Sequence, residues 1–197
     1  MELYKREQYL KKIRGFYHSD DLIKVITGIR RCGKSSLMQT ISDELVMSGV
    51  KEENIIYIDL DRRGYRSIKN ADQLDELIAK YDNIEGMKYL FIDEVQNVTG
   101  FEDVLNGFRS ESGWSIFITG SNSYLLSGEL VTKLTGRYLE FEMFPLTFEE
   151  FNCAFCLKSS PQAPVTIMIG AMLATNMARI CCNPKGIALP TGILPSI

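Results

Sequence analysis

Short apolar runs alternate with amphipathic stretches along most of the chain. The apolar runs lie at residues 22–27, 54–60, 88–95, 114–120 and 138–144, and helical spacing of apolar positions fills 34–47, 71–82 and 101–112. The runs are continuous rather than alternating, which is typical of strands covered on both faces of a parallel sheet. We therefore predict an α/β fold, a three-layer sandwich with a mostly parallel central sheet of about five strands.

The first residues predict a helix that precedes this alternation. Tyr4, Tyr9, Ile13 and Phe16 stand at mixed helical spacings with Lys and Arg between them, and the segment lacks the apolar core of a signal peptide. Without a secretory signal, the five cysteines are expected to be reduced thiols in a cytoplasmic protein.

Composition changes abruptly near residue 152. Residues 152–197 hold five of the six prolines and four of the five cysteines but no Asp or Glu. We expect one domain over 1–151 and a loosely structured tail over 152–197, either a proline-rich surface segment or a frame-shifted or rearranged end. The tail's apolar run, 165–178, is 14 residues long, short of the ~20 needed for a membrane span. Cys153 and Cys156 with Cys181 and Cys182 could be drawn as four zinc ligands, but the second pair is adjacent and lacks the usual two-residue spacer.

Charge excludes a globally basic nucleic-acid binder, because 22 basic and 25 acidic residues give a net charge of −3. Residues 1–35 are locally basic, with nine cations and four acids. A solvated helix face together with phosphate-site residues is the simpler explanation, so a nucleic-acid partner is left open but is not indicated.

The strongest chemical signal is GIRRCGKS at residues 28–35, which matches G-x-x-x-x-G-K-[ST] between a predicted strand and a predicted helix. Backbone amides of such a loop and the helix N-terminus bind phosphates, and Gly28 and Gly33 allow the close approach. Lys34 would contact the β- and γ-phosphates and Ser35 would ligate Mg²⁺. The expected nucleotide-binding residues are Gly28, Ile29, Arg30, Arg31, Cys32, Gly33, Lys34, Ser35 and Ser36. Arg30 and Arg31 have the alternative of facing a partner or solvent.

A second motif, FIDE at residues 91–94, ends an apolar strand in two carboxylates. Such acids emerge at the carboxyl edge of the sheet, where nucleotides bind in these folds. We expect Asp93 to hold Mg²⁺ and Glu94 to orient or deprotonate the attacking water. An acidic strand end that faces solvent is the alternative.

Two weaker candidates complete the predicted site. A polar residue after the next strand, Ser121 or Asn122, could reach the γ-phosphate or the lytic water, or could simply cap a turn. Arg137 precedes the last strand and is a candidate charge sensor on the γ-phosphate, in its own subunit or a neighbour's. A surface salt bridge explains Arg137 equally well.

From about residue 1 to 151 the chain resembles a family of prokaryotic AAA-type P-loop ATPases. The resemblance rests on GIRRCGKSSL, YIDLD, FIDEVQNV, ITGSNSYLL, LTGRY and FPLTFEEF, in this order. It implies an additional-strand, catalytic-glutamate ATPase core, with Lys34 and Ser35 on phosphate and Mg²⁺, the pair Asp93 and Glu94, and Arg137 as sensor. Family members usually continue past the FEEF-like segment into helices and a further domain, which residues 152–197 do not resemble.

These motifs predict an ATP-binding protein that uses ATP and Mg²⁺. The leading hypothesis is a Mg²⁺-dependent ATP hydrolase that couples its nucleotide state to an unidentified protein partner or to self-association. The alternative is a nucleotide-binding switch with little hydrolysis. A GTPase is disfavoured, because no N-K-x-D motif follows the second carboxylate motif.

Overall fold

The computed structural model describes residues 4–120, 133–134 and 136–152. Five strands of this part form one sheet in the order β2-β3-β4-β1-β5, and every neighbouring pair is parallel. The strands are β1 (Ile23–Gly28), β2 (Ile55–Asp59), β3 (Lys88–Asp93), β4 (Trp114–Thr119) and β5 (Tyr138–Met143). The helices are α1 (Glu7–Ile13), α2 (Lys34–Met47), α3 (Ala71–Ala79) and α4 (Phe101–Ser110), with 3₁₀ turns η1 (Arg14–Phe16), η2 (Glu52–Asn54), η3 (Arg63–Tyr65) and η4 (Val95–Asn97).

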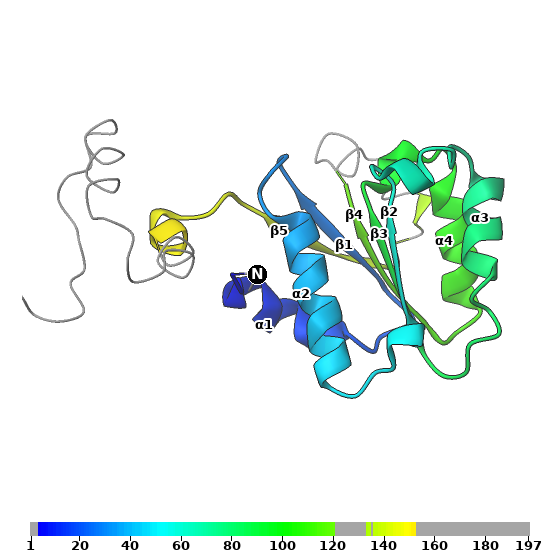
Figure 1. Cartoon of the computed structure of the whole chain (residues 1–197), viewed down its shortest axis with the longest axis horizontal. Helices are drawn as coiled ribbons and strands as arrows, with labels where there is room; N and C mark the ends of the chain where they lie inside the picture. The colour runs from blue at the N-terminus through cyan, green and yellow to red at the C-terminus, as the bar shows by residue number, and fades with distance from the viewer. Residues whose placement is uncertain (1–3, 121–132, 135, 153–197) are drawn as a thin grey trace, which may run out of the picture. The chain divides into compact units, whose positions relative to one another are not determined.

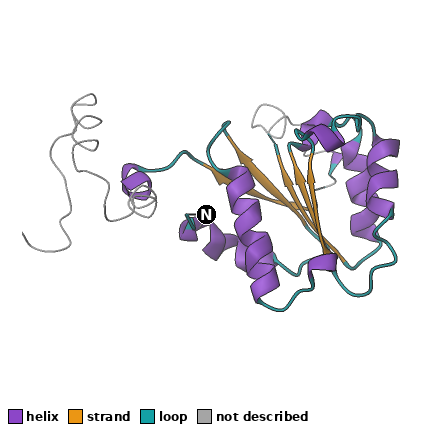
Figure 2. Ribbon diagram, in the orientation of Figure 1, coloured by secondary structure: helices purple, strands orange, loops and turns teal. Residues whose placement is uncertain are grey.

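Helices cover both faces of the sheet, which makes a three-layer sandwich (Figures 1 and 2). The side chains of each strand alternate between two apolar clusters. In β3, Leu90 and Ile92 join the cluster that includes α3 and α4, whereas Tyr89 and Phe91 join the cluster that includes α1 and α2. The predicted α/β sandwich is confirmed, and the sheet is wholly rather than mostly parallel.

The N-terminal helix is part of the core, as its pattern predicts. Tyr9, Leu10 and Ile13 of α1 are buried in the same cluster as α2. Arg14 links α1 to α2, because its guanidinium forms ion pairs with Glu7 of α1 at 2.8 Å and with Glu44 of α2 at 2.7 Å. The α-helix begins at Glu7 and ends at Ile13, so it is shorter than the predicted segment.

The strand order brings three strand ends together. β4 lies between β1 and β3, as expected for an ATPase core with an additional strand. Its register aligns Thr119 with Ile26 of β1 and aligns Ile118 with Ile92 of β3. The carboxyl ends of β1, β4 and β3 therefore meet at one edge of the sheet, where α/β proteins bind their ligands.

A buried lysine lies toward the opposite edge. Lys24 of β1 is inaccessible to solvent, and its Nζ donates to Ser19 O at 2.6 Å, Leu22 O at 3.0 Å and Ser115 Oγ at 2.9 Å. Burial lowers the pKa of its ammonium group to about 7. The polar contacts explain how a cation is accommodated in a sheet that is otherwise apolar.

In the described ranges, no helix combines the length and the apolar character that a membrane span requires. The predictions made for the tail beyond Asn152, including the apolar run at 165–178, lie outside the described residues.

Leu10 tests the contribution of α1 to the fold. Leu10→Ala should lower the free energy of unfolding by about 2–5 kcal/mol, because it removes a fully buried side chain and leaves a cavity. Lys12→Ala, at an exposed position of the same helix, should change it by less than about 0.5 kcal/mol. Urea unfolding followed by circular dichroism measures both. Equal stability of the two variants would show that α1 is not part of the folding unit.

Candidate nucleotide-binding site

The loop between β1 and α2 is compact because two glycines adopt backbone conformations that other residues avoid. Gly28 has φ 148°, and a Cβ there would lie 2.5 Å from Met143 O of β5 and 2.6 Å from Cys32 Sγ. Gly33, the N-cap of α2, has φ 100°. Between them, Cys32 N–H donates to Ile29 O at 3.3 Å. The strand can therefore turn directly into the helix.

The start of α2 is arranged to receive an anion. Its N-cap is a glycine without a side-chain hydrogen bond, and its first turn holds no acidic residue. Leu37 N–H donates to Gly33 O at 2.9 Å, so the amides before Leu37 precede the first intrahelical bond. Ser35 and Ser36 are exposed at this end. The positive end of the helix dipole is therefore not neutralised by the helix itself.

Lys34 folds back over the loop. Its side chain is 5% exposed, and Nζ donates to Gly28 O at 3.1 Å and Ile29 O at 3.4 Å. These carbonyls hold the ammonium beside the helix N-terminus. An anion bound at the loop amides would lie within reach of this charge.

Asp93 and Glu94 are joined through Thr119, the last residue of β4. The Thr119 hydroxyl donates a short hydrogen bond to Asp93 Oδ1 and accepts from Glu94 N–H at 3.0 Å. Asp93 is 3% exposed. Burial, and then the carboxylates of Asp93 and Asp59, raise the pKa of Tyr57 on β2, so its phenol stays uncharged. One hydroxyl thus fixes both the carboxylate of Asp93 and the backbone of Glu94.

Glu94 leaves the strand in a left-handed conformation, with φ 57° and ψ 50°. This region is unfavourable for a residue with a side chain, and it occurs preferentially at functional sites. The carboxylate of Glu94 accepts from Gln96 Nε2 at 2.5 Å. Gln96 Oε1 is buried and has no hydrogen-bond partner in the described part of the chain.

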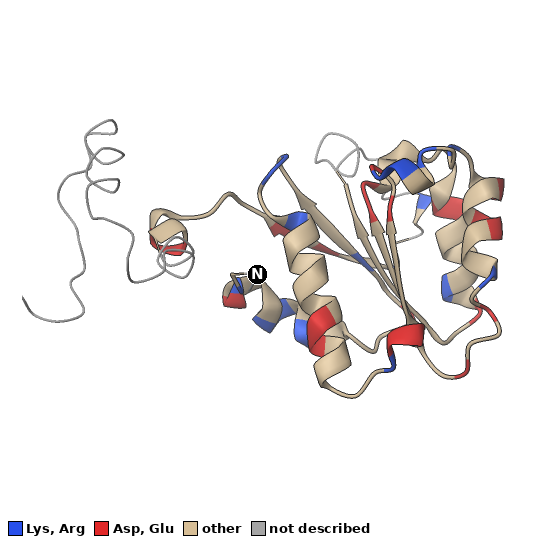
Figure 3. Ribbon diagram, viewed as in Figure 1, with Lys and Arg blue, Asp and Glu red and all other residues tan. Residues whose placement is uncertain are grey.

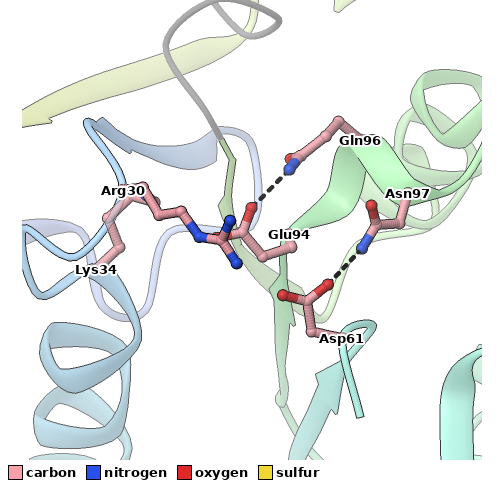
Figure 4. Close-up of a pocket in the computed structure, with 6 residues that line it drawn as sticks. All are labelled: Arg30, Lys34, Asp61, Glu94, Gln96 and Asn97. Atoms are coloured by element: carbon pink, nitrogen blue, oxygen red, sulfur yellow. Dashed lines mark hydrogen bonds between the residues drawn. The ribbon is translucent and has the colours of Figure 1, made fainter. Parts of the chain in front are cut away.

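The loop and Glu94 meet at a cavity of about 280 Å³, which Asp93 does not line (Figure 4). It is lined by Arg30, Lys34, Asp61, Glu94, Gln96 and Asn97. In Figure 4 the Arg30 side chain extends from the loop toward Glu94 and Asp61. Asp61, beyond β2, accepts from Asn97 Nδ2 at 3.0 Å. The fold therefore brings Arg30, Lys34 and Glu94, three of the residues predicted from the sequence, into one cavity.

The oxygen ligands near this cavity suit Mg²⁺. Ser35 offers a hydroxyl at the start of α2, and Asp93 offers a carboxylate at the end of β3. Among the described residues there is no cluster of three or more His, Cys, Asp or Glu side chains that could hold a metal. This donor set fits an ion that takes few protein ligands and completes its octahedron with phosphate oxygens and water.

Arg137 is not brought to this cavity. It is exposed and directly precedes β5, and Ile23 N–H at the start of β1 donates to its carbonyl oxygen. The ladder from the Ile23–Tyr138 pair to the Gly28–Met143 pair spans five residue steps, or ~17 Å at ~3.3 Å per residue. Arg137 therefore lies at the amino edge of the sheet, opposite the loop. Ser121 and Asn122 fall outside the described residues.

Arg6 is a residue that the sequence did not identify. It is 6% exposed, and its guanidinium donates to Cys32 O at 3.1 Å, Phe144 O at 2.7 Å and Glu150 Oε2 at 2.9 Å. Burial alone would raise the pKa of the Glu150 carboxyl, but the hydrogen bonds from Arg6 and from the Thr147 backbone hold it below its usual value. Arg6 thus ties the nucleotide loop to the segment after β5.

Comparisons with known proteins show the family of this chain. A family model described as "AAA domain" matches residues 20–152. An uncharacterised protein of Haemophilus influenzae is 42% identical over 147 residues, which are 74% of this chain and 36% of that protein. A Methanocaldococcus jannaschii protein, also uncharacterised, is 40% identical over 134 residues, or 66% of this chain and 28% of that protein.

Solved structures share the fold at low sequence identity. In the Saccharomyces cerevisiae Hsp104:casein complex, the matched part covers 78% of this chain and 29% of that chain, with a TM-score of 0.57 and 12% identity. A DNA polymerase III gamma subunit-related protein of Thermotoga maritima matches 72% of this chain and 47% of that chain, with a TM-score of 0.53 and 13% identity. The chain spans about a third of the length of the two uncharacterised relatives.

Gly28 provides a direct test of the loop geometry. Gly28→Ala should lower stability by at least about 2 kcal/mol and abolish nucleotide binding, because Cβ collides with a backbone carbonyl on β5 at an unfavourable φ. Gly107→Ala is the matched control, since nothing lies within 4 Å of a Cβ there. In the middle of α4 it should instead stabilise by roughly 0.5–1 kcal/mol. Thermal unfolding and nucleotide titration measure both, and an unaffected Gly28→Ala protein would contradict the described loop.

Proposed function

Because this chain belongs to the AAA domain family, we propose that it binds ATP with Mg²⁺ and hydrolyses the bond between the β- and γ-phosphates. The observation that carries the proposal is the cavity that Lys34 and Glu94 share. A phosphate chain bound by the loop amides and Lys34 would place the γ-phosphate beside the carboxylate of Glu94. Hydrolysis requires that a cation and a general base lie close to the γ-phosphate.

Each residue has a defined part in the reaction. The oxygen of a water molecule attacks the γ-phosphorus while Glu94 accepts its proton, and the bond from the γ-phosphorus to the bridging oxygen breaks. The products are ADP and inorganic phosphate. Lys34 and the loop amides bind the charge on the phosphate oxygens. Ser35 and Asp93 would hold Mg²⁺, which neutralises phosphate charge when it is bound.

Thr119 is the positioning residue of this proposal. Its hydroxyl holds Asp93 through a side-chain contact and Glu94 through a backbone contact. A left-handed residue such as Glu94 needs support from its surroundings, because its own backbone conformation is unfavourable. Thr119 supplies part of that support at the end of the neighbouring strand.

We further propose that nucleotide state is passed to a partner or to a second copy of the chain. Arg6 supports this, because it contacts the loop at Cys32 and the segment after β5 at Phe144 and Glu150. Arg137 is exposed at the far edge of the sheet, so its role as a charge sensor is proposed only toward the nucleotide of a neighbouring subunit.

A nucleotide-dependent switch with little hydrolysis is the second candidate. It is favoured by the 2.5 Å hydrogen bond that Gln96 donates to the carboxylate of Glu94. While this bond persists, one of the carboxylate oxygens is occupied and the side chain is less available to a water molecule. Rearrangement around Gln96 would then decide whether bound ATP is hydrolysed.

Measurements of ATP binding and turnover with Mg²⁺ separate the candidates. Lys34→Ala should weaken binding at least about tenfold, and Glu94→Gln should retain binding while kcat falls by roughly 10²–10⁴. Lys80→Ala and Glu111→Gln, at exposed positions elsewhere, are the matched controls. Binding without turnover in the unaltered protein would favour the switch. Absence of ATP binding would contradict both candidates, and competition with GTP tests the choice of nucleotide.

Thr119→Val tests the positioning role. The substitution keeps the shape of the side chain but removes the hydroxyl, so kcat should fall about tenfold or more while the Kd for ATP changes by less than about threefold. Thr99→Val, at an exposed position, should leave both values unchanged. An equal loss of binding and turnover in Thr119→Val would point to a purely structural role.

A further inference from the structure

A second cavity of about 520 Å³ lies beside the nucleotide cavity, at the carboxyl end of β2. We call it the β2 recess. Its lining residues are Arg30, Leu60, Asp61, Arg66, Lys69 and Asn97. Arg30, Asp61 and Asn97 also line the nucleotide cavity, so the two spaces adjoin. The nucleotide mechanism proposed above uses none of the residues that line the recess alone.

The recess gathers cations that have no partner in the described part of the chain. Arg30, Arg66 and Lys69 are exposed, and their side chains form no hydrogen bond or ion pair within the described part of the chain. Asp61 is the carboxylate in the lining, and Asn97 donates to it. Within the described lining, three positive charges against one negative charge leave an excess that a bound anion would relieve.

Further cations stand in the two chain segments that contribute Arg30 and Arg66 to the recess. Arg31 follows Arg30 in the loop after β1, and Arg63 precedes Arg66 in the segment after β2; both are exposed and unpaired among the described residues. Figure 3 shows basic positions in both segments. Arg62 is left out of this set, because it pairs with Asp59 at 2.9 Å. The extended arrangement exceeds what a single phosphate group would need.

The lining also indicates what part of a ligand is contacted. Leu60 is the apolar member of the described lining, and none of the described lining residues is aromatic. Bases are bound in such sites by stacking on aromatic side chains, whereas phosphates are bound by Lys and Arg. The recess therefore suits a chain of phosphates without regard to base sequence. A concave site admits a flexible single strand more readily than the convex surface of a duplex.

We propose that the β2 recess binds the phosphate backbone of a single-stranded nucleic acid, independently of its sequence. Arg66 and Lys69 contact phosphates within the recess, and Arg31 and Arg63 extend the path beyond it. Arg30 lines both cavities and would lie between the single-stranded nucleic acid and the nucleotide, so the two ligands would be neighbours. Binding of the nucleic acid does not require ATP hydrolysis. An experiment can therefore contradict this proposal without contradicting the proposed function, and the reverse also holds.

Fluorescence anisotropy of a labelled oligothymidylate of about 12 nucleotides, titrated with the full chain without nucleotide, tests the proposal. We expect a Kd in the ~10⁻⁶–10⁻⁴ M range at physiological salt, as is typical of binding through phosphates alone. Arg66→Ala with Lys69→Ala should weaken binding roughly tenfold at about 0.1 M salt. The slope of log K against log salt should become shallower by ~1.4, because two fewer phosphates of the single strand are neutralised.

The matched control is Lys11→Ala with Lys12→Ala, which removes the same charge from exposed positions on α1. It should retain wild-type affinity and slope, and both double variants should keep the circular dichroism spectrum and ATP binding of the parent. The proposal is overturned if the oligonucleotide does not bind or if the α1 variant, rather than the recess variant, loses affinity. Displacement by millimolar inorganic phosphate, or tighter binding of a poly-glutamate peptide, would equally overturn it.

Discussion

The nucleotide cavity depends on how closely β1 approaches β5 at Gly28. The ladder pairs Gly28 with Met143, and the space where a side chain would begin is filled by the Met143 carbonyl and by the sulfur of Cys32. The chain must therefore leave the sheet at this point, and it turns so tightly that the Gly28 carbonyl receives Lys34. A larger residue at position 28 would displace the loop, Lys34 and the start of α2 together, because they are consecutive parts of one tight turn.

The position of Asp93 and Glu94 depends on the register of the parallel strands. Thr119 is paired with Ile26 on one side and follows the Ile118–Ile92 pair on the other. A slip of one residue in β4 would turn the Thr119 hydroxyl to the other face and leave the buried carboxylate of Asp93 without its donor. The acidic pair is thus positioned by backbone pairing over the whole sheet, and the short loop after β3 contributes the left-handed turn at Glu94.

Local patterns were sufficient to predict the elements and the loop. Apolar runs predicted all five strands. Both faces are buried in the central strands β1, β3 and β4, whereas the edge strands β2 and β5 are only partly buried. The contacts of Thr119, Gln96 and Arg6 could not be predicted, because they depend on register and on residues far apart in the chain. The sequence did contain an indication for Thr119, because it stands at the end of its apolar segment just as Asp93 stands at the end of the preceding one. The sequence also contained an indication for Arg137, which directly precedes β5. In a parallel sheet, a residue just before a strand lies at the amino edge, away from the loop.

The matched family region begins at residue 20, yet the folded unit begins earlier. Leu10 and Ile13 close the apolar cluster over α2, and Arg6 supplies a donor to the carbonyl of Cys32 inside the nucleotide loop. The family boundary therefore cuts through a structural unit. A fragment trimmed to residues 20–152 would therefore lack the apolar residues of α1 that cover α2, and the loop carbonyl of Cys32 would lose its hydrogen-bond donor.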